Sequence, residues 1–428
     1  MMPISTANDF HTEFTELKQR FMMMEAELEL TIRDPQHGIE GFVVVWNTKI
    51  CEGGPFDRNG VGIGKGGTRI LPDLKLSDIK RLARAMAEKN AAAGLPLGGA
   101  KSGLVADCNA EDYEEKCRRF YKRVQDSGIL AEDGGMFGGF GYDVGCKPPL
   151  NAKWACEELK TYNSFTGKAV EDGGTDYDRQ GIAGLGVATA AKNLIEHRKQ
   201  DIENIRFAVQ GLGAMGAAVA QYFTAYGGKL HVLSDPKYNG TWVFENNASQ
   251  DLIDALFQQN QETAQSLLSK EGTHISKDPQ DALYEDVDVI FPCALEDTLT
   301  RENAHKVKAP FICEGANNPT TDDAHEILFA NGQIVIPDII ANPGGIIAAY
   351  VELSLDITPE ENAKTRGKVN AAKDETIRRI SANTIELLNM LDRLNVRPDL
   401  IGDYMAYRNI FYGIPASTHE ETGETNAA

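Results

Sequence analysis

The run Ile205–Asp235, IRFAVQGLGAMGAAVAQYFTAYGGKLHVLSD, decides the fold of the second half of the chain. Its opening IRFAVQ predicts a buried strand, and Lys229–Ser234 predicts the next strand. The two strands flank the segment GLGAMG, which has the GxGxxG spacing and opens a helix of small residues. Asp235 follows the first of these glycines by 24 residues. A glycine pattern with its strand, its helix and its acidic residue predicts a βαβ unit that binds a dinucleotide.

Each glycine of this turn has its own physical task. Gly211 permits the tight turn out of the strand, Gly213 lets the backbone reach a pyrophosphate, and Gly216 lets helix and strand pack closely. Ala214 and Met215 begin the helix, where free N–H groups and the positive end of the helix dipole attract phosphate. We therefore expect these five residues to bind the cofactor.

The acidic residue predicts which dinucleotide is preferred. Asp235 would accept hydrogen bonds from the adenosine ribose, and its charge would repel a 2′-phosphate, which favours NAD over NADP. Lys237 works against this preference because it lies two residues further on and could pair with that phosphate. NADP therefore stays open.

Apolar runs alternate with helical stretches beyond this unit and predict a doubly wound α/β sheet. Further strands are expected at Val287–Pro292, Ala309–Cys313 and Gln333–Pro337. A long helix is expected over residues 181–198, leading into this domain. Asn317 and Asn342 lie in the loops that follow, where turn chemistry alone would be a sufficient reason for polar residues.

The first half of the chain is organised around Gly64–Asp107, in which three lysines stand among glycines or near a helix end. Lys65 lies in GKGG and Lys101 in GGAKSG, where no neighbouring side chain obstructs a ligand and backbone N–H groups can approach an anion. Lys89 lies near the end of an amphipathic helix that begins at Ser77. Any one lysine is usually a surface residue. The three together predict a site for carboxylates.

The other elements of this half are expected from their periodicity. They are a helix within Phe10–Glu29, strands at Phe42–Asn47 and Gly66–Leu71, and a second helix at Ala110–Gln125. Lys101 is expected in a loop.

Six phrases, in order, resemble the glutamate/leucine/phenylalanine/valine dehydrogenase family, and most of all its glutamate dehydrogenase branch. They are GKGGTR, EKNAAAGLPLGGAKSG, YDVG, TGKAVEDGG, EGANNPTT and IPDIIANPGG. The resemblance implies an NAD(P)-dependent amino acid dehydrogenase, which converts an L-amino acid, foremost glutamate, to its 2-oxo acid and ammonium.

The resemblance also implies a role for several side chains. Lys89 would hold the α-carboxylate, and Lys65 would bind the distal carboxylate of glutamate. Lys101, its pKa depressed by burial and by neighbouring cations, would activate the water that attacks the imine. Asp143 in YDVG would exchange protons with the amino nitrogen, with Asp133 in AEDGG as the alternative.

Two positions depart from the family pattern. Ala349 stands at the substrate-binding position where the glutamate enzymes usually have a serine, whose hydrogen bond to a charged group would contribute about 1.5 to 3 kcal/mol. Ala183 stands where a threonine usually contacts the nicotinamide amide. The loops that hold Ala294, Asn317 and Asn342 are implied to line the nicotinamide ribose.

The sequence thus predicts an α/β protein of two domains. These are a discontinuous α/β substrate and oligomerisation domain, residues 1–180 and 395–428, and a Rossmann-like doubly wound NAD(P)-binding domain, residues 181–394. Two alternatives stay open: a dehydrogenase for leucine, valine or another apolar amino acid, and a non-catalytic nucleotide-binding regulator that has kept the fold. A homo-oligomer, by analogy a hexamer, is expected.

The amino-acid composition limits the classes of partner that the chain is expected to bind. With a formal charge of −20 over 428 residues, the surface should repel polyanions, so neither nucleic acid nor an anionic membrane is expected as a partner. Seven scattered cysteines without a CxxC pair predict reduced thiols in a cytoplasm and no metal site. No secretory signal and no membrane span are expected, since the start lacks a basic region before an apolar run, and no run of about 18 apolar residues occurs.

Overall fold

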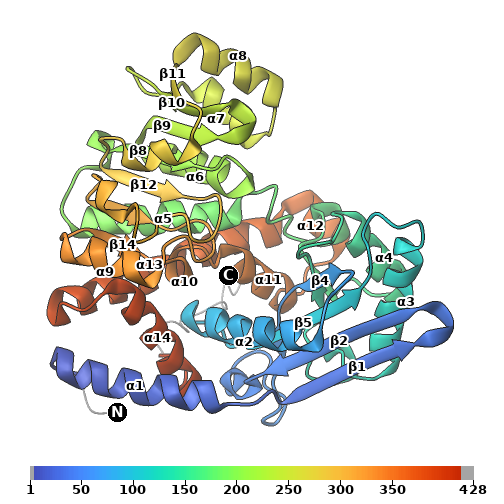
Figure 1. Cartoon of the computed structure of the whole chain (residues 1–428). Helices are drawn as coiled ribbons and strands as arrows, with labels where there is room; N and C mark the ends of the chain where they lie inside the picture. Colours follow the sequence, from blue (N-terminus) through green and yellow to red (C-terminus); the bar gives the residue numbers. More distant parts are fainter. Residues whose placement is uncertain (1–3, 416–428) are drawn as a thin grey trace, which may run out of the picture. The chain divides into compact units, whose positions relative to one another are not determined.

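The computed structural model describes residues 4–415, and contacts within it divide the chain into two compact units. One, called here the lysine unit, consists of Thr12–Gly174, Glu352–Thr365 and residues 404–415. The other, the glycine-loop unit, consists of Thr175–Val351, Arg366–Asp403 and residues 4–11. Each unit has its own sheet (Figure 1). The predicted domain boundaries at residues 180 and 395 stay predictions.

The sheet of the lysine unit has the strand order β1-β2-β5-β3, and β4 also pairs with β5. Its strands are β1 (Leu28–Asp34), β2 (Ile39–Trp46), β3 (Gly64–Lys65), β4 (Thr68–Leu71) and β5 (Gly98–Val105). β1, β2 and β5 pair antiparallel in turn, whereas β3 and β4 run parallel to β5. The central strand β5 carries Lys101.

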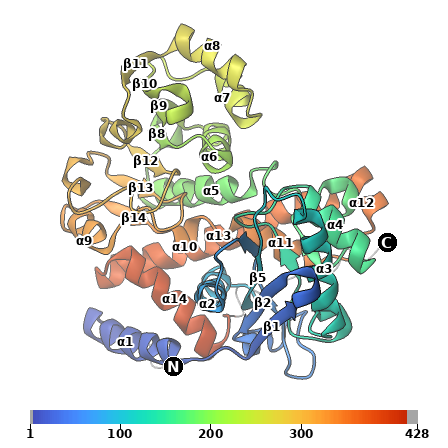
Figure 2. The same cartoon turned by 45° about the vertical axis from the view of Figure 1, so that its right-hand side comes forward.

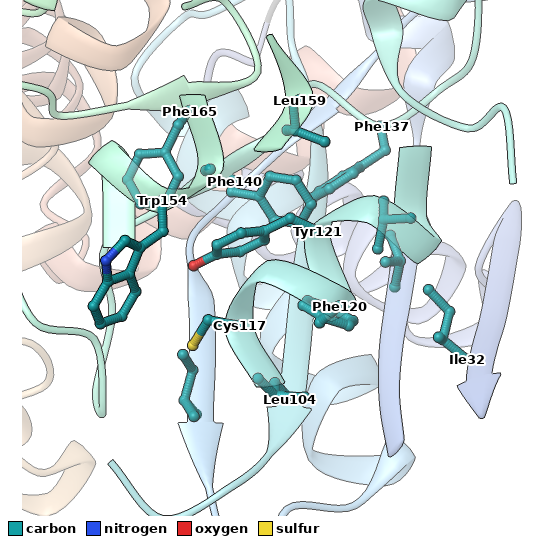
Figure 3. Packing of buried hydrophobic residues seen from close by; sticks show 14 of the residues in the cluster. Ile32, Leu104, Cys117, Phe120, Tyr121, Phe137, Phe140, Trp154, Leu159 and Phe165 are labelled. Atoms are coloured by element: carbon teal, nitrogen blue, oxygen red, sulfur yellow. The ribbon is translucent and has the colours of Figure 1, made fainter. Parts of the chain in front are cut away.

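Successive side chains of a strand point to opposite faces of the sheet. Both faces of this sheet carry apolar side chains, and a helix covers each of them. Val44 packs with Ala83 of helix α2 (Leu76–Ala92), and its neighbour Val43 belongs to the cluster on the other face, under helix α3 (Tyr113–Asp126). Figure 3 shows the aromatic rings of that second cluster, which include Tyr121, Phe137 and Phe140. This packing fixes the backbone at Phe140, which the candidate site uses.

Smaller elements complete the lysine unit. Strands β6 (Phe140–Gly141) and β7 (Phe165–Thr166) pair in parallel, and helix α4 (Leu150–Leu159) connects them in the chain. Helix α12 (Pro359–Thr365) belongs to the segment that returns to this unit. The amide of Asn362 in α12 donates to the carbonyl oxygens of Val170 and Gly174, which ties the returning segment to the rest of the unit. Helices α1 (Ala7–Met23) and α14 (Pro398–Tyr412) each begin in the residues assigned to the glycine-loop unit and end in the lysine unit.

The glycine-loop unit contains a seven-stranded sheet of order β11-β10-β9-β8-β12-β13-β14 (Figure 2). Its strands are β8 (Arg206–Gln210), β9 (Lys229–Asp235), β10 (Gly240–Val243), β11 (Thr273–Ser276), β12 (Val289–Pro292), β13 (Phe311–Cys313) and β14 (Ile334–Ile336). β9, β8, β12, β13 and β14 are parallel, and β10 is antiparallel to both of its neighbours.

The helices of this unit connect the strands and cover the sheet. They are α5 (Ile182–His197), α6 (Ala214–Ala225), α7 (Gln250–Phe257), α8 (Gln261–Glu271), α9 (Asp322–Ala330), α10 (Asp338–Ala341), α11 (Gly344–Ser354) and α13 (Gly367–Leu394). Helix α11 continues into the lysine unit from Glu352. The predicted α/β fold with a Rossmann-like doubly wound sheet is confirmed.

Three local predictions for the first half are refined or corrected by the structure. The helix expected within Phe10–Glu29 is present as α1 and ends at Met23, because the residues from Leu28 alternate in burial and pair with β2. The strand expected at Gly66–Leu71 begins two residues later, at Thr68 of β4. Gly66 leaves no room for a side chain there, since a Cβ on it would lie 1.8 Å from the carbonyl oxygen of Ala100.

The third correction concerns Lys101, which lies on a strand and not in a loop. Glycine is depleted in strands, so GGAKSGLV did not predict β5. The glycines are there because α2 lies directly on the strand: a Cβ on Gly99 would come within 2.2 Å of the amide nitrogen of Ala87. Across residues 4–415, none of the helices combines the length and the apolar character needed to span a bilayer.

Candidate functional site

The side chain of Lys65 is buried in the lysine unit, and main-chain oxygens hold its ammonium group. Its Nζ donates to the carbonyl oxygens of Phe140 at 2.6 Å, Gly139 at 3.0 Å and Gly66 at 3.2 Å. The residue is 1% exposed. Burial lowers the pKa of Lys65 from 10.5 to about 7, although the nearby Glu352 charge opposes this shift. The ammonium is thus close to its titration point at neutral pH.

The last turn of α2 positions this lysine. The buried side-chain amide of Asn90 donates to the carbonyl oxygens of Lys65 at 3.2 Å and Gly98 at 2.8 Å. The turn therefore ties β3 to β5. Lys89, the residue before Asn90, is half-buried in the same turn.

Lys101 and Asp143 form an ion pair, in which the Lys101 Nζ contacts the Asp143 Oδ2. Arg69 on β4 completes the cluster, with its Nη2 3.1 Å from Oδ1 of Asp143 and its Nε 3.3 Å from Oδ2. The backbone amide of Val144 also donates to Oδ1, at 2.8 Å. The Lys101 side chain is 7% exposed and that of Asp143 is 15% exposed. The structure thus brings the two predicted catalytic residues together.

The protonation behaviour of this pair suits proton transfer. Burial lowers the pKa of the Lys101 ammonium, and the Asp143 charge only partly offsets that effect. Burial would raise the pKa of Asp143, but the charges of Lys101 and Arg69 outweigh it and hold that pKa below its usual range. Near neutral pH, Asp143 is a carboxylate and Lys101 releases its proton more readily than an ordinary lysine does.

The structure distinguishes between Asp143 and Asp133, the two candidates for the aspartate that exchanges protons with the substrate. Asp133 lies in an exposed 3₁₀ turn (Ala131–Asp133), whereas Asp143 contacts Lys101. Lys65 is paired opposite Gly99 of β5, two residues before Lys101, and its Nζ contacts the carbonyl oxygen of Phe140, three residues before Asp143. Lys65, Lys101 and Asp143 therefore belong to one site.

The sequence did not predict two participants in this region. One is Arg69, although it stands in the phrase GKGGTR. The other is a second buried ion pair, in which Nζ of Lys168 contacts Oε1 of Glu352, with the two side chains 3% and 1% exposed. The backbone amide of Gly167 donates to the other carboxylate oxygen at 3.0 Å. A lysine after a glycine in TGKAVEDGG was an available signal, but its partner lies 184 residues away in the sequence.

The glycine turn of the other unit has the geometry that the sequence predicts. Gly211 has a φ of +87°, which only glycine adopts readily. A Cβ on Gly216 would lie 1.8 Å from the carbonyl oxygen of Gly211, whereas a Cβ on Gly213 would meet nothing within 4 Å. Ala214 and Met215 open helix α6. Space beside Gly213 at a helix N-terminus fits a dinucleotide pyrophosphate.

Asp235 ends β9 and holds this turn. Its Oδ2 accepts a hydrogen bond from the amide of Leu212 at 2.7 Å, and its Oδ1 accepts one from the amide of Lys237 at 2.9 Å. The Lys237 ammonium donates to the carbonyl oxygen of Leu212 at 2.6 Å and to Oε1 of Gln259 at 3.1 Å. Both charged groups therefore stand at the glycine turn, and Lys237 already has partners there.

The predicted loop residues also gather around the ends of the parallel strands. A Cβ on Gly211 would lie 2.8 Å from Ala294, so these two backbones touch. The side-chain amide of Asn342 donates to Oδ1 of Asn317 at 3.2 Å and to the carbonyl oxygen of Gly315 at 3.1 Å. Asn317 and Asn342 are thereby brought together.

The two departures from the family pattern lie on helices of the glycine-loop unit. Ala349 is buried in α11, at 3% exposure. Ala183 lies in the first turn of α5, and a Cβ on Gly344 would come within 2.9 Å of the Ala183 Cα. Residue 183 thus stands where the start of α11 meets α5.

Comparisons with family models and with known proteins identify the same dehydrogenase family. Residues 173–390 match the model of the Glutamate/Leucine/Phenylalanine/Valine dehydrogenase family, and residues 57–136 match the Glu/Leu/Phe/Val dehydrogenase dimerisation domain. The NADP(+)-dependent glutamate dehydrogenase of Pyrobaculum calidifontis is 32% identical over 357 residues, which are 80% of this chain and 79% of that protein.

Solved structures share the fold. Glutamate dehydrogenase 2 of Plasmodium falciparum superposes with a TM-score of 0.73 at 20% identity, covering 94% of this chain and 91% of that one. The hetero-hexameric glutamate dehydrogenase of Thermus thermophilus superposes with a TM-score of 0.67, also at 20% identity, over 96% of both chains.

Proposed function

Because the chain belongs to the glutamate/leucine/phenylalanine/valine dehydrogenase family, we propose that it interconverts L-glutamate with 2-oxoglutarate and ammonium, using NAD(P). The observation that carries this proposal is the buried Lys101–Asp143 contact beside the buried ammonium of Lys65. A carboxylate that is ionised at neutral pH, a lysine that releases its proton readily and a cation for an anionic side chain are what this reaction requires.

Each residue has a defined task in the oxidative direction. Lys89 holds the α-carboxylate and Lys65 the distal carboxylate of the substrate. Asp143 takes a proton from the α-ammonium, which leaves a neutral amine from whose α-carbon a hydride can depart. Lys101, as the neutral amine, takes a proton from the water that attacks the imine. The bound cofactor supplies hydride acceptance, and the protein supplies position and charge.

We propose NAD as the preferred cofactor. Asp235 ends β9 and contacts the glycine turn, and we infer that its carboxylate would accept from the adenosine ribose and repel a 2′-phosphate. The Lys237 ammonium would have to leave the Leu212 carbonyl and Gln259 to pair with such a phosphate. The NADP dependence of the Pyrobaculum enzyme keeps NADP as the alternative.

The residues proposed to contact the cofactor are Gly211, Gly213, Ala214, Met215, Gly216, Asp235, Ala294, Asn317 and Asn342. Residues 1–180 and 395–428 are proposed to bind the amino acid and to form the subunit contacts, and residues 181–394 to bind the dinucleotide. A homohexamer is the proposed assembly, supported by the matched dimerisation domain and by the hexameric assembly of the Thermus enzyme. A cytoplasmic location is proposed because all seven cysteines, each within the described part of the chain, are free thiols.

A dehydrogenase for apolar amino acids is the second candidate, and Ala349 is the observation that favours it. Its methyl group offers no hydrogen bond to a distal carboxylate. The presence of a buried ammonium at residue 65 speaks for glutamate, because an uncompensated cation is unfavourable next to an apolar side chain.

One assay tests the proposal. The purified chain is given ammonium, NADH or NADPH, and either 2-oxoglutarate or 2-oxoisocaproate, and oxidation of the cofactor is followed. We expect 2-oxoglutarate with NADH to be the best pair. Lys101→Ala should lose a factor of about 10² to 10⁴ in kcat, while Lys153→Ala, on an exposed side chain, should match the parent. Undiminished ammonium-dependent turnover by Lys101→Ala would refute the mechanism.

A further inference from the structure

The carboxylate of Asp143 has a full set of hydrogen-bond donors. A carboxylate offers about four lone-pair sites on its two oxygens. Oδ1 receives Arg69 Nη2 and the amide of Val144, and Oδ2 receives Arg69 Nε and the ammonium of Lys101. No site is left over for a substrate proton unless one of these donors moves.

The four donors differ in how freely they can leave. The amide of Val144 belongs to the residue next to Asp143, so backbone geometry fixes it. The Arg69 guanidinium binds both oxygens in a fork, and arginine side chains stay charged in proteins. Lys101 carries its ammonium on a flexible four-carbon stem. Lys101 is therefore the donor that can give up its place.

Arg69 is itself firmly placed. It lies on β4, paired opposite Gly103 of β5, and the segment that holds Asp143 runs beside β4. The amide of Ile70 donates to the carbonyl oxygen of Val144 at 2.9 Å, and the Cys146 thiol donates to that of Thr68 at 3.1 Å. Two hydrogen bonds thus tie strand β4 to the Asp143 segment.

We propose that Arg69 is a positioning residue, which locks Asp143 so that proton exchange takes place at Oδ2 alone, in the position that Lys101 holds in this structure. The substrate α-ammonium displaces Lys101 from Oδ2 and transfers a proton to that oxygen, and the N–H electron pair stays on the nitrogen. This assignment rests on the proposed function and adds to it an order of events. Once displaced, the Lys101 ammonium gives its extra proton to solvent water, and as the neutral amine it turns toward the attacking water while Asp143 receives the substrate.

The experiment compares Arg69→Lys and Arg69→Met with the parent, using the full chain and pH profiles of kcat and kcat/KM from pH 3 to 10. Removing the charge in Arg69→Met should move the acidic limb upward by about 1 to 3 pH units, because an adjacent arginine lowers an aspartate pKa by that amount. Arg69→Lys keeps the charge but not the fork. Its acidic limb should stay near that of the parent, while kcat falls by about 10²-fold through misplacement of the carboxylate. Arg119→Met, on an exposed helical arginine, is the matched control and should change neither.

The outcomes separate this inference from the proposed function. A parental acidic limb in Arg69→Met, or a rise in the KM for the 2-oxo acid as the sole change, would mean that Arg69 does not act through Asp143. Should Arg69→Met fail to fold, Arg69→Lys decides alone, and parental kcat in that variant overturns the inference. Asp143→Asn and Lys101→Ala are assayed in parallel. If they stay active, the proposed function fails too; if they are inactive while both Arg69 variants behave as the parent, this inference alone fails.

Discussion

The Nζ of Lys65 lies 2.6 Å from the carbonyl oxygen of Phe140, in the buried part of the lysine unit. Within residues 4–415, the hydrogen bonds of this ammonium go to main-chain carbonyls, and it forms no ion pair. Carbonyl dipoles solvate a cation without cancelling its charge. The group therefore keeps its attraction for an anion, and this is the basis of the substrate choice proposed above.

Replacing this lysine should change substrate preference. The distal carboxylate has to take the place of one of the three carbonyl oxygens that accept from the Lys65 ammonium. In Lys65→Leu this contact is lost, so kcat/KM for 2-oxoglutarate should fall by about 10- to 100-fold, because a hydrogen bond to a charged group contributes about 1.5 to 3 kcal/mol. Activity with 2-oxoisocaproate should rise relative to the parent. Steady-state kinetics with both acids measure the change, and thermal unfolding checks the fold. An unchanged ratio of the two activities would exclude Lys65 from the distal end of the substrate.

The pH dependence of substrate binding should carry the signature of the same group. Burial lowers the Lys65 pKa to about 7, so the ammonium loses its proton as pH rises above that value. Each pH unit above the pKa leaves about tenfold less of the charged form, and the KM for 2-oxoglutarate should rise accordingly between pH 7 and 9. The KM measured across this range for Lys65→Leu should lack that rise. A flat KM in the parent would show that Lys65 stays protonated or takes no part.

The sequence predicted the features that are determined by residues close to one another in the chain. The glycine turn at Gly211–Gly216 is specified by neighbouring residues, and its strand, helix and Asp235 were found from spacing alone. Strand β5 was not predicted because glycine is depleted in strands. Its glycines are there because helix α2 packs directly on the strand, and single-residue preferences do not encode such a contact.

Long-range contacts account for the rest. Lys65 and Lys101 were recognised from their glycine surroundings and from family resemblance. Two of the three carbonyl oxygens that hold Lys65, however, lie 74 and 75 residues away in the sequence, and the guanidinium that holds Asp143 lies 74 residues away. Side-chain partners of that kind come from tertiary packing, which no pattern in a single sequence specifies.

The glycine turn should respond differently to a methyl group at two of its positions. Gly216→Ala places a Cβ 1.8 Å from the carbonyl oxygen of Gly211, so the turn must shift and the melting temperature should drop. Gly213→Ala meets open space in this unit, so the melting temperature should stay near that of the parent. Its KM for NADH should rise by about tenfold or more, because the methyl group stands where the backbone meets the pyrophosphate. A parental KM in Gly213→Ala would remove this turn from the cofactor site.

Breaking the buried Lys168–Glu352 pair should destabilise the lysine unit. Glu352→Ala leaves the Lys168 ammonium buried without its carboxylate, which costs about 3 to 5 kcal/mol in the free energy of unfolding. Lys168→Met combined with Glu352→Gln should recover most of that loss, because no lone charge stays buried and the glutamine oxygen can still accept from the Gly167 amide. Denaturant unfolding measures all three proteins, with Glu196→Ala as the control, since its exposed pair with Lys192 is worth about 0 to 1 kcal/mol. If the double variant were as unstable as Glu352→Ala, the cost would lie in packing and not in the unpaired charge.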